Sequence, residues 1–173
     1  TKTVKKGLFK KEKNVPTGME IGALSWKGAE NRVARFSNYG KKNVDLFSPG
    51  VAIYSTVPDG KYGNAQGTSM AAPAAAGVAA ILRSYYPELS AVQVKSIMEK
   101  SVIAQEGEVY KPGTTEKVAF TELCVSGGVV SAVNAVEMAD QTKAKKNKKA
   151  VWREAGMGKS VAGKVTKAKV VTP

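Results

Sequence analysis

The sequence contains no histidine and a single cysteine among its 173 residues. The lone thiol of Cys124 excludes a disulfide within the chain, and its neighbours Leu123 and Val125 predict a buried, inert side chain. A catalytic cysteine needs a basic partner, and a zinc site needs several histidines or cysteines. We therefore expect neither a cysteine nucleophile nor a metal site, and we expect no cofactor.

Long apolar runs are also missing. Residues 70–82 carry no charge, but the run falls short of the ~20 residues that cross a bilayer, so no membrane span is expected. No secretory signal is visible, and the chain starts at Thr1 rather than at methionine. We therefore expect the natural N-terminus to lie further upstream.

Positive charge is abundant only at the two ends. The net charge is +13, of which residues 1–13 contribute +5 and residues 141–173 contribute +9, while the middle of the chain carries −1. Basic tails suggest, as the alternative function, a non-catalytic module that binds anions or nucleic acid. Such tails usually stay solvated, and neither interleaved aromatics nor a nucleic-acid motif accompanies them. A nucleic-acid partner is therefore not expected.

The chain divides into three parts by composition. Residues 1–18 are polar and lysine-rich, which predicts a basic loop or a severed connection. Residues 19–140 contain the periodic apolar patterns of a folded domain. Residues 141–173 repeat Lys, Gly and Ala without a sustained pattern, which predicts a disordered tail.

Three short strands are predicted in the first half of the domain, at residues 19–25, 44–47 and 51–57. A Pro-Asp-Gly turn at 58–60 follows, and a glycine-containing loop then leads to Gly67. Strands followed by helices at these lengths predict an α/β layered domain.

The first predicted helix starts near Ser69 or Met70 and ends before Pro87. Pro73 is tolerated only in the first turn of a helix, which fixes this start. Because residues 70–82 are uncharged on every side, we expect the helix to run through the protein interior.

Two further helices are predicted. Ser90 and Gln93 have the spacing of a capping box, which indicates a helix start. A third helix is expected after Gly127-Gly128, with an apolar stripe of Val129, Val133 and Val136.

The segment that carries chemistry is Gly-Thr-Ser-Met-Ala-Ala-Pro at residues 67–73. Gly67 allows a tight turn into the helix, and the helix start leaves backbone N–H groups without intrahelical partners. These donors can stabilise an oxyanion that forms beside the Ser69 hydroxyl, as acyl transfer by a serine nucleophile requires. The alternative is that Ser69 only caps the helix.

This segment resembles the nucleophile motif of the subtilisin-like serine proteases (subtilases, peptidase family S8). The resemblance covers roughly residues 19–139. Its further matching segments are residues 34–40, 44–51, 53–56, 77–80 and 127–135.

The resemblance implies a subtilisin-like three-layer αβα fold with a mostly parallel sheet, present here only in part as the C-terminal portion of the catalytic domain. It implies a serine endopeptidase with a polypeptide substrate and an extracytoplasmic location. Ser69 would be the nucleophile and would supply its own N–H to the oxyanion. Thr68, beside Gly67, would either assist that site or serve only the turn.

Two departures from the family pattern stand out. Ala74 replaces a histidine that is structural in many members. The catalytic aspartate and histidine and the oxyanion asparagine of the family lie upstream of the matched region, and the chain has no histidine. We therefore expect the chain to be inactive alone and to need the missing N-terminal part of the same protease. Both a truncated sequence and one chain of a processed enzyme remain open.

Overall fold

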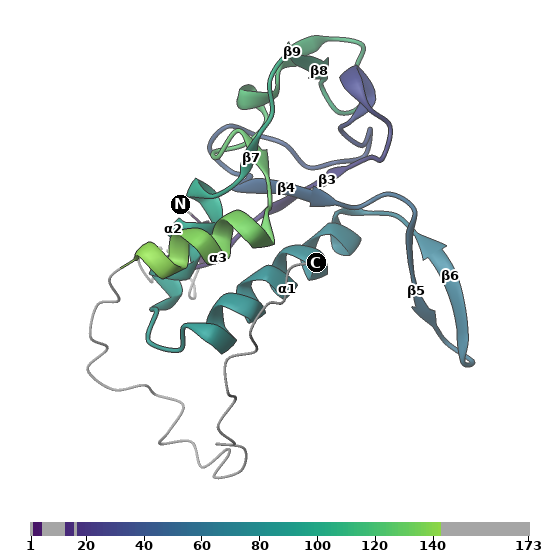
Figure 1. Ribbon diagram of the computed structural model, residues 1–173. Coiled ribbons are helices and arrows are strands. Elements are labelled where there is room, and N and C mark those ends of the chain that lie inside the picture. The colour runs from purple at the N-terminus through teal and green to yellow at the C-terminus, as the bar shows by residue number, and fades with distance from the viewer. Residues whose placement is uncertain (1, 5–12, 16, 143–173) are drawn as a thin grey trace, which may run out of the picture.

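A computed structural model describes residues 2–4, 13–15 and 17–142 (Figure 1). In the N-terminal segment, which was expected to be a loop or a severed connection, strands β1 (Lys2–Val4) and β2 (Lys13–Val15) pair antiparallel with each other. Apart from its first two residues, the tail predicted for residues 141–173 lies outside the described residues.

A four-stranded sheet forms the centre of the domain, in the order β3 (Ile21–Leu24), β4 (Leu46–Pro49), β10 (Gly128–Val129) and β7 (Ile103–Ala104). The pairs β3–β4 and β4–β10 are parallel, and only β7 runs antiparallel. This arrangement confirms the predicted α/β fold with a mostly parallel sheet, and the first two strands lie within a few residues of their predicted positions.

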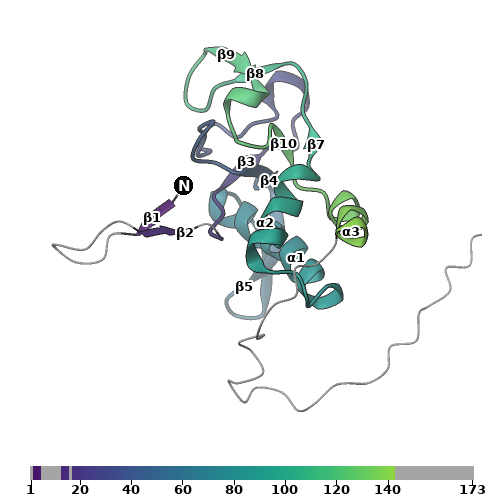
Figure 2. The ribbon, with the colours of Figure 1, turned by 90° about the vertical axis from the view of Figure 1, so that its left-hand side faces the viewer.

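Three α-helices pack together on one face of this sheet: α1 (Thr68–Tyr85), α2 (Ala91–Lys100) and α3 (Ala132–Gln141) (Figures 1 and 2). Leu46 of β4 is fully buried in a core that it shares with all three helices. The other fully or largely buried members of this core are Ala75, Val78, Leu82, Leu89, Val94, Ile97, Met98, Ala135 and Ala139.

The other face of the sheet is covered differently. Above it in Figure 1 lies the hairpin of β8 (Glu108–Tyr110) and β9 (Lys117–Ala119), which leads into a 3₁₀ turn, η2 (Phe120–Glu122). Phe47 of β4 meets Phe120 edge to face, with ring centroids 5.1 Å apart, and both side chains are fully buried. Within the described part of the chain, this face carries no α-helix, so the three-layer fold is present in part.

Helix α1 differs from the prediction of a fully enclosed helix. Its buried residues are Ala71, Ala75, Val78 and Leu82, which form one face toward the sheet and the other helices. On the opposite side Ala72, Ala76, Gly77, Ala80 and Ile81 are exposed. The sequence did not reveal that one side of α1 is exposed, because its run of small, uncharged side chains includes no polar face that would indicate the solvent side. Among the described residues, no helix combines the length and apolarity of a membrane span.

The region between residues 60 and 67 was expected to be a loop, but it contains a strand. β5 (Ile53–Val57) pairs antiparallel with β6 (Lys61–Ala65) in an exposed hairpin that projects from the domain (Figure 1). Val57 pairs with Lys61, so residues 58–60 form the connection, and Asp59 and Gly60 within it both have positive φ, 66° and 65°, which Asp and Gly tolerate better than most residues. The Asp-Gly pair was therefore the signal for a hairpin.

The starts of α2 and α3 are indicated by their capping serines and not by the spacing of apolar residues. Ser90 accepts a hydrogen bond from the Gln93 N–H at 3.3 Å, and the Gln93 side chain accepts one from the Ser90 N–H at 3.0 Å, which confirms the capping box. The third helix starts at Ala132, after Ser131 caps it. The predicted valine stripe was wrong, because Val129 lies in β10 and Val133 is 68% exposed.

Candidate active site

The turn that contains Gly67 lies where β4 ends and α1 begins. Its N–H donates to the Gly50 carbonyl at 2.8 Å, and Gly50 directly follows β4. A Cβ on Gly50 would approach the Ala23 Cβ to 2.7 Å and the Gly67 carbonyl oxygen to 2.8 Å. This close approach, which only glycine permits at residue 50, fixes the start of α1 against the carboxyl ends of the parallel strands. In α/β folds this edge of the sheet is where ligands bind.

Gly67 itself has a backbone conformation that side chains disfavour, with φ 155° and ψ 163°. A Cβ at this position would lie 3.0 Å from the Ser69 Oγ and 3.4 Å from the Met70 Sδ. Glycine is therefore required both by the backbone turn and by the space beside the Ser69 hydroxyl.

Backbone donors surround Ser69 at the first turn of α1. The N–H groups of Met70 and Ala71 donate to the Gly67 carbonyl at 3.0 and 3.2 Å. Among the described residues, the N–H groups of Thr68 and Ser69 donate to no protein acceptor. Two free donors at the positive end of a helix dipole form a local anion-binding environment.

The Ser69 side chain is exposed, and its hydroxyl is not used as a cap. Its one hydrogen bond within the described residues is a contact with the Met70 Sδ at 3.5 Å, which is weak because a thioether is a poor acceptor. The hydroxyl is thus open to a ligand, and no general base contacts it in the part of the chain that the structure describes.

Thr68 is the first residue of α1 and is half-buried. The structure therefore brings Gly67, Thr68 and Ser69 together in one turn, as the sequence predicted. The catalytic roles assigned to them remain predictions.

A partly buried ion-pair cluster was not predicted from the sequence. Asp45 is 5% exposed and pairs with the Lys95 ammonium at 3.0 Å, while Lys95 also contacts Glu99 at 3.4 Å and donates to the Gly18 carbonyl at 2.9 Å. Burial raises the pKa of Glu99. Burial alone would lower the pKa of Lys95, but the hydrogen bond and charge of Asp45 raise it. The cluster joins the residue directly before β4 to α2, at the end of β4 opposite the start of α1, so we interpret it as structural.

Cys124 is 1% exposed and lies in the core on the face of the sheet that the β8–β9 hairpin covers. Desolvation raises the pKa of its thiol. Burial of this residue agrees with the sequence prediction, and a high pKa disfavours the reactive thiolate.

The chain is similar to known proteins in sequence. The sequence model described as "Subtilase family" matches residues 13–158, which is most of the chain. Subtilisin NAT from Bacillus subtilis subsp. natto is 40% identical over 86 residues, which are 50% of this chain and 22% of that protein. Subtilisin-like protease 1 from Plasmodium vivax is 35% identical over 108 residues, which are 62% of this chain and 15% of that protein.

Solved structures give the same result. Fervidolysin from Fervidobacterium pennivorans, a keratinolytic enzyme related to subtilisin, superposes with a TM-score of 0.56 and 26% identity over 75% of this chain and 20% of that one. The A-subunit of the AB5 toxin from E. coli shares the fold, with a TM-score of 0.55 and 24% identity over 70% of this chain and 37% of that one. The chain thus spans a minor part of the length of each of these relatives. By the extent of the family match and the agreement of the fold, the chain belongs to the subtilase family.

Proposed function

We propose that this chain is the nucleophile-bearing part of a serine endopeptidase, with Ser69 as the nucleophile. One observation carries the proposal: the Ser69 hydroxyl is exposed beside two backbone N–H groups that have no acceptor among the described residues. Membership of the subtilase family supports a serine-type peptidase in general. A polypeptide is accordingly the proposed substrate.

In the proposed mechanism, the Ser69 oxygen attacks the carbonyl carbon of the scissile peptide bond while a base accepts the hydroxyl proton. The negative charge that develops on the carbonyl oxygen is stabilised by the N–H of Ser69 at the helix start. The base then delivers the proton to the leaving amine, the C–N bond breaks, and water hydrolyses the acyl-enzyme. Gly67 keeps the space beside the hydroxyl free of a side chain.

The sequence has no histidine, and no base contacts the Ser69 hydroxyl within the described residues, which supports a base supplied from outside this chain. We propose that an upstream part of the same protease supplies the histidine, the aspartate and a second oxyanion donor. The uncharged outer side of α1, where Ala72, Ala76 and Ile81 are exposed, supports such a partner, because packing against it would remove apolar surface from water.

A complementation experiment tests this proposal. Hydrolysis of fluorescently labelled casein is measured for the chain alone, for the upstream part alone, and for the two together. We expect hydrolysis only by the mixture, and loss of that hydrolysis with Ser69→Ala. Ser84→Ala is the matched control, because Ser84 is an exposed serine near the other end of the same helix. Full hydrolysis by the Ser69→Ala mixture would refute the assignment.

A further inference from the structure

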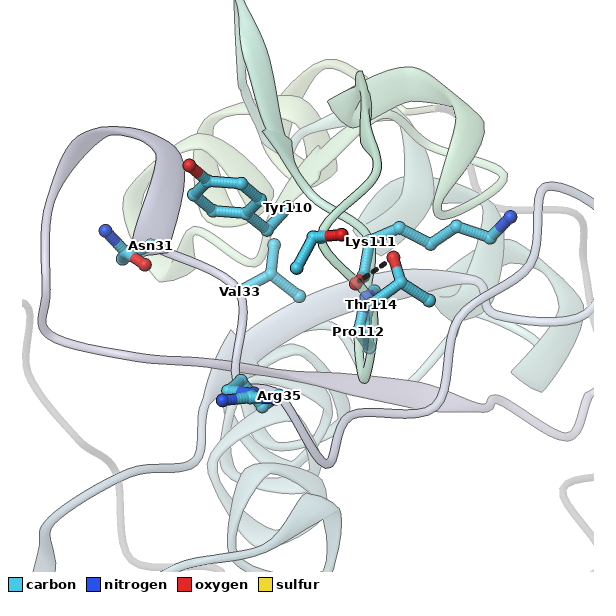
Figure 3. A pocket seen from close by; sticks show the side chains of 8 residues that line it. Asn31, Val33, Arg35, Tyr110, Lys111, Pro112 and Thr114 are labelled. Atoms are coloured by element: carbon cyan, nitrogen blue, oxygen red, sulfur yellow. Dashed lines mark hydrogen bonds between the residues drawn. The ribbon is translucent and has the colours of Figure 1, made fainter.

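A cavity of about 330 Å³ lies between the chain after η1 (Ala29–Asn31) and the loop that joins β8 to β9 (Figure 3). Val33, Tyr110 and Pro112 give it an apolar lining, and Val33 and Pro112 are themselves buried. Asn31, Arg35 and Thr114 add polar groups. This volume and this mixture of apolar walls with a few polar groups are typical of a site for a small ligand or a side chain.

The loop that forms one wall is held in place by its own hydrogen bonds. The Lys111 N–H donates to the Glu116 carbonyl at 2.9 Å, and the Thr114 hydroxyl donates to the Lys111 carbonyl at 3.0 Å, the bond drawn in Figure 3. The Glu116 N–H donates to the Thr114 hydroxyl at 3.1 Å. Val109, fully buried, anchors the preceding strand. The wall is therefore preorganised, which lowers the entropic cost of binding.

The basic groups around the cavity differ in whether they are paired. Lys111 pairs with Glu116 at 2.9 Å, and its side chain extends away from Val33 in Figure 3. Lys117 pairs with Glu30 at 2.6 Å across the seam between the hairpin and η1. Within the described ranges, the guanidinium of Arg35 forms neither a hydrogen bond nor an ion pair. Arg35 is thus the cation at the cavity that is available to a ligand.

The segment that lines one wall of the cavity also packs against the start of α1. Arg35 and Val33 flank Ala34, which is 4% exposed. Ala34 belongs to a small buried cluster with Ala23 and Ala71, and Ala71 lies two residues after Ser69. One wall of the cavity therefore belongs to the segment that packs against the first turn of α1.

We infer that this cavity binds an acidic side chain of a polypeptide. The carboxylate pairs with the Arg35 guanidinium, whose planar group of donors matches a carboxylate, while Val33, Tyr110 and Pro112 contact the methylene groups. The choice of a polypeptide as the ligand rests on the proposed function. Recognition of the carboxylate does not, because it depends on Arg35 and not on the Ser69 hydroxyl.

The test measures binding of two fluorescein-labelled pentapeptide amides, Ala-Ala-Glu-Ala-Ala and Ala-Ala-Gln-Ala-Ala, by fluorescence anisotropy. The full chain carries Ser69→Ala, which removes the proposed nucleophile and leaves the cavity intact. We expect the glutamate peptide to bind roughly ten-fold more tightly than the glutamine peptide, as a charge-assisted pair predicts. Arg35→Ala is expected to reduce this ratio to about one.

Lys100→Ala is the matched control, because it removes one positive charge from an exposed residue of α2, on the other face of the sheet. It should leave the glutamate preference unchanged. Circular dichroism checks that both variants keep the fold. The inference is overturned if the two peptides bind equally, if neither binds, or if folded Arg35→Ala keeps the preference. Failure of the proposed function would show separately, as casein hydrolysis that survives Ser69→Ala.

Discussion

Ser69 and Ser90 both lie at the start of a helix, and their surroundings differ in every respect that matters for chemistry. Ser90 precedes α2 with an extended backbone, and its hydroxyl accepts the Gln93 N–H. Ser69 lies inside the first turn of α1, and Gly67 takes the N-cap position without a side-chain bond. The comparison shows that the hydroxyl of a capping serine bonds to the backbone, whereas the Ser69 hydroxyl makes only a weak contact with the Met70 Sδ. Within the described part of the chain, the Ser69 N–H donates to no acceptor.

The largest expected effect separates these two serines by activity. In the complete protease proposed above, Ser69→Ala should lower kcat on the order of 10⁶-fold, because the acylation step would lose its proposed nucleophile. Ser90→Ala should leave kcat unchanged within about two-fold, since its hydroxyl serves only α2. Steady-state hydrolysis of a chromogenic peptide measures both. Similar losses for the two variants would remove the distinction.

The second-largest expected effect concerns Gly67, which leaves the space beside the Ser69 hydroxyl empty. Gly67→Ala places a Cβ 3.0 Å from the Ser69 Oγ and forces a side chain onto a positive φ of 155°. Displacement of the nucleophile should lower kcat/KM by about 10²-fold or more. Gly77→Ala on the same helix is the control, because a Cβ there meets no atom within 4 Å. Full activity of Gly67→Ala would contradict the geometry proposed here.

For stability we expect the opposite order, with a larger effect for Ser90→Ala than for Ser69→Ala. Ser90→Ala should lower the free energy of unfolding by about 1 kcal/mol, because the N–H of Gln93 loses its acceptor. Ser69→Ala should change it by less than about 0.5 kcal/mol, as for an exposed side chain that caps nothing. Urea denaturation of the complete protease, followed by tryptophan fluorescence, compares the two. A larger loss for Ser69→Ala would identify Ser69 as a structural cap.

The smallest expected effect concerns Ser48, which lies in a strand and not at the start of a helix. Ser48 in β4 is fully buried, and its hydroxyl has no hydrogen-bond partner among the residues that the structure describes. A buried hydroxyl without a partner opposes folding, so Ser48→Ala should leave stability unchanged or raise it by up to about 1 kcal/mol. The same urea titration measures it. A loss above about 1 kcal/mol would mean that the Ser48 hydroxyl has a partner in solution.

The sequence predicted the features that depend on local chemistry. The cap at Ser90 and the helix start near Ser69 were predicted from adjacent residue types, whose effect on the backbone does not depend on the rest of the fold. Pro87 likewise ends α1 as expected, after Tyr85. The features that sequence reasoning missed depend on contacts between distant segments.

Helix α1 illustrates the limit, because its row of alanines has no polar side to indicate which face is buried. Val133 shows the opposite error, since an apolar residue at helical spacing is 68% exposed while Ala135 is fully buried. The Asp45–Lys95 pair and the cavity beside Arg35 each bring together residues far apart along the chain. No local sequence pattern therefore predicts either of them.

The most direct test of the central claim is to find which serine reacts. The complete protease is labelled with a fluorophosphonate probe, digested, and mapped by mass spectrometry. The account predicts a single adduct, on the Ser69 hydroxyl, that disappears when the protein is unfolded before labelling. An adduct on any other residue, or no adduct on Ser69 in a protease that hydrolyses casein, would contradict it.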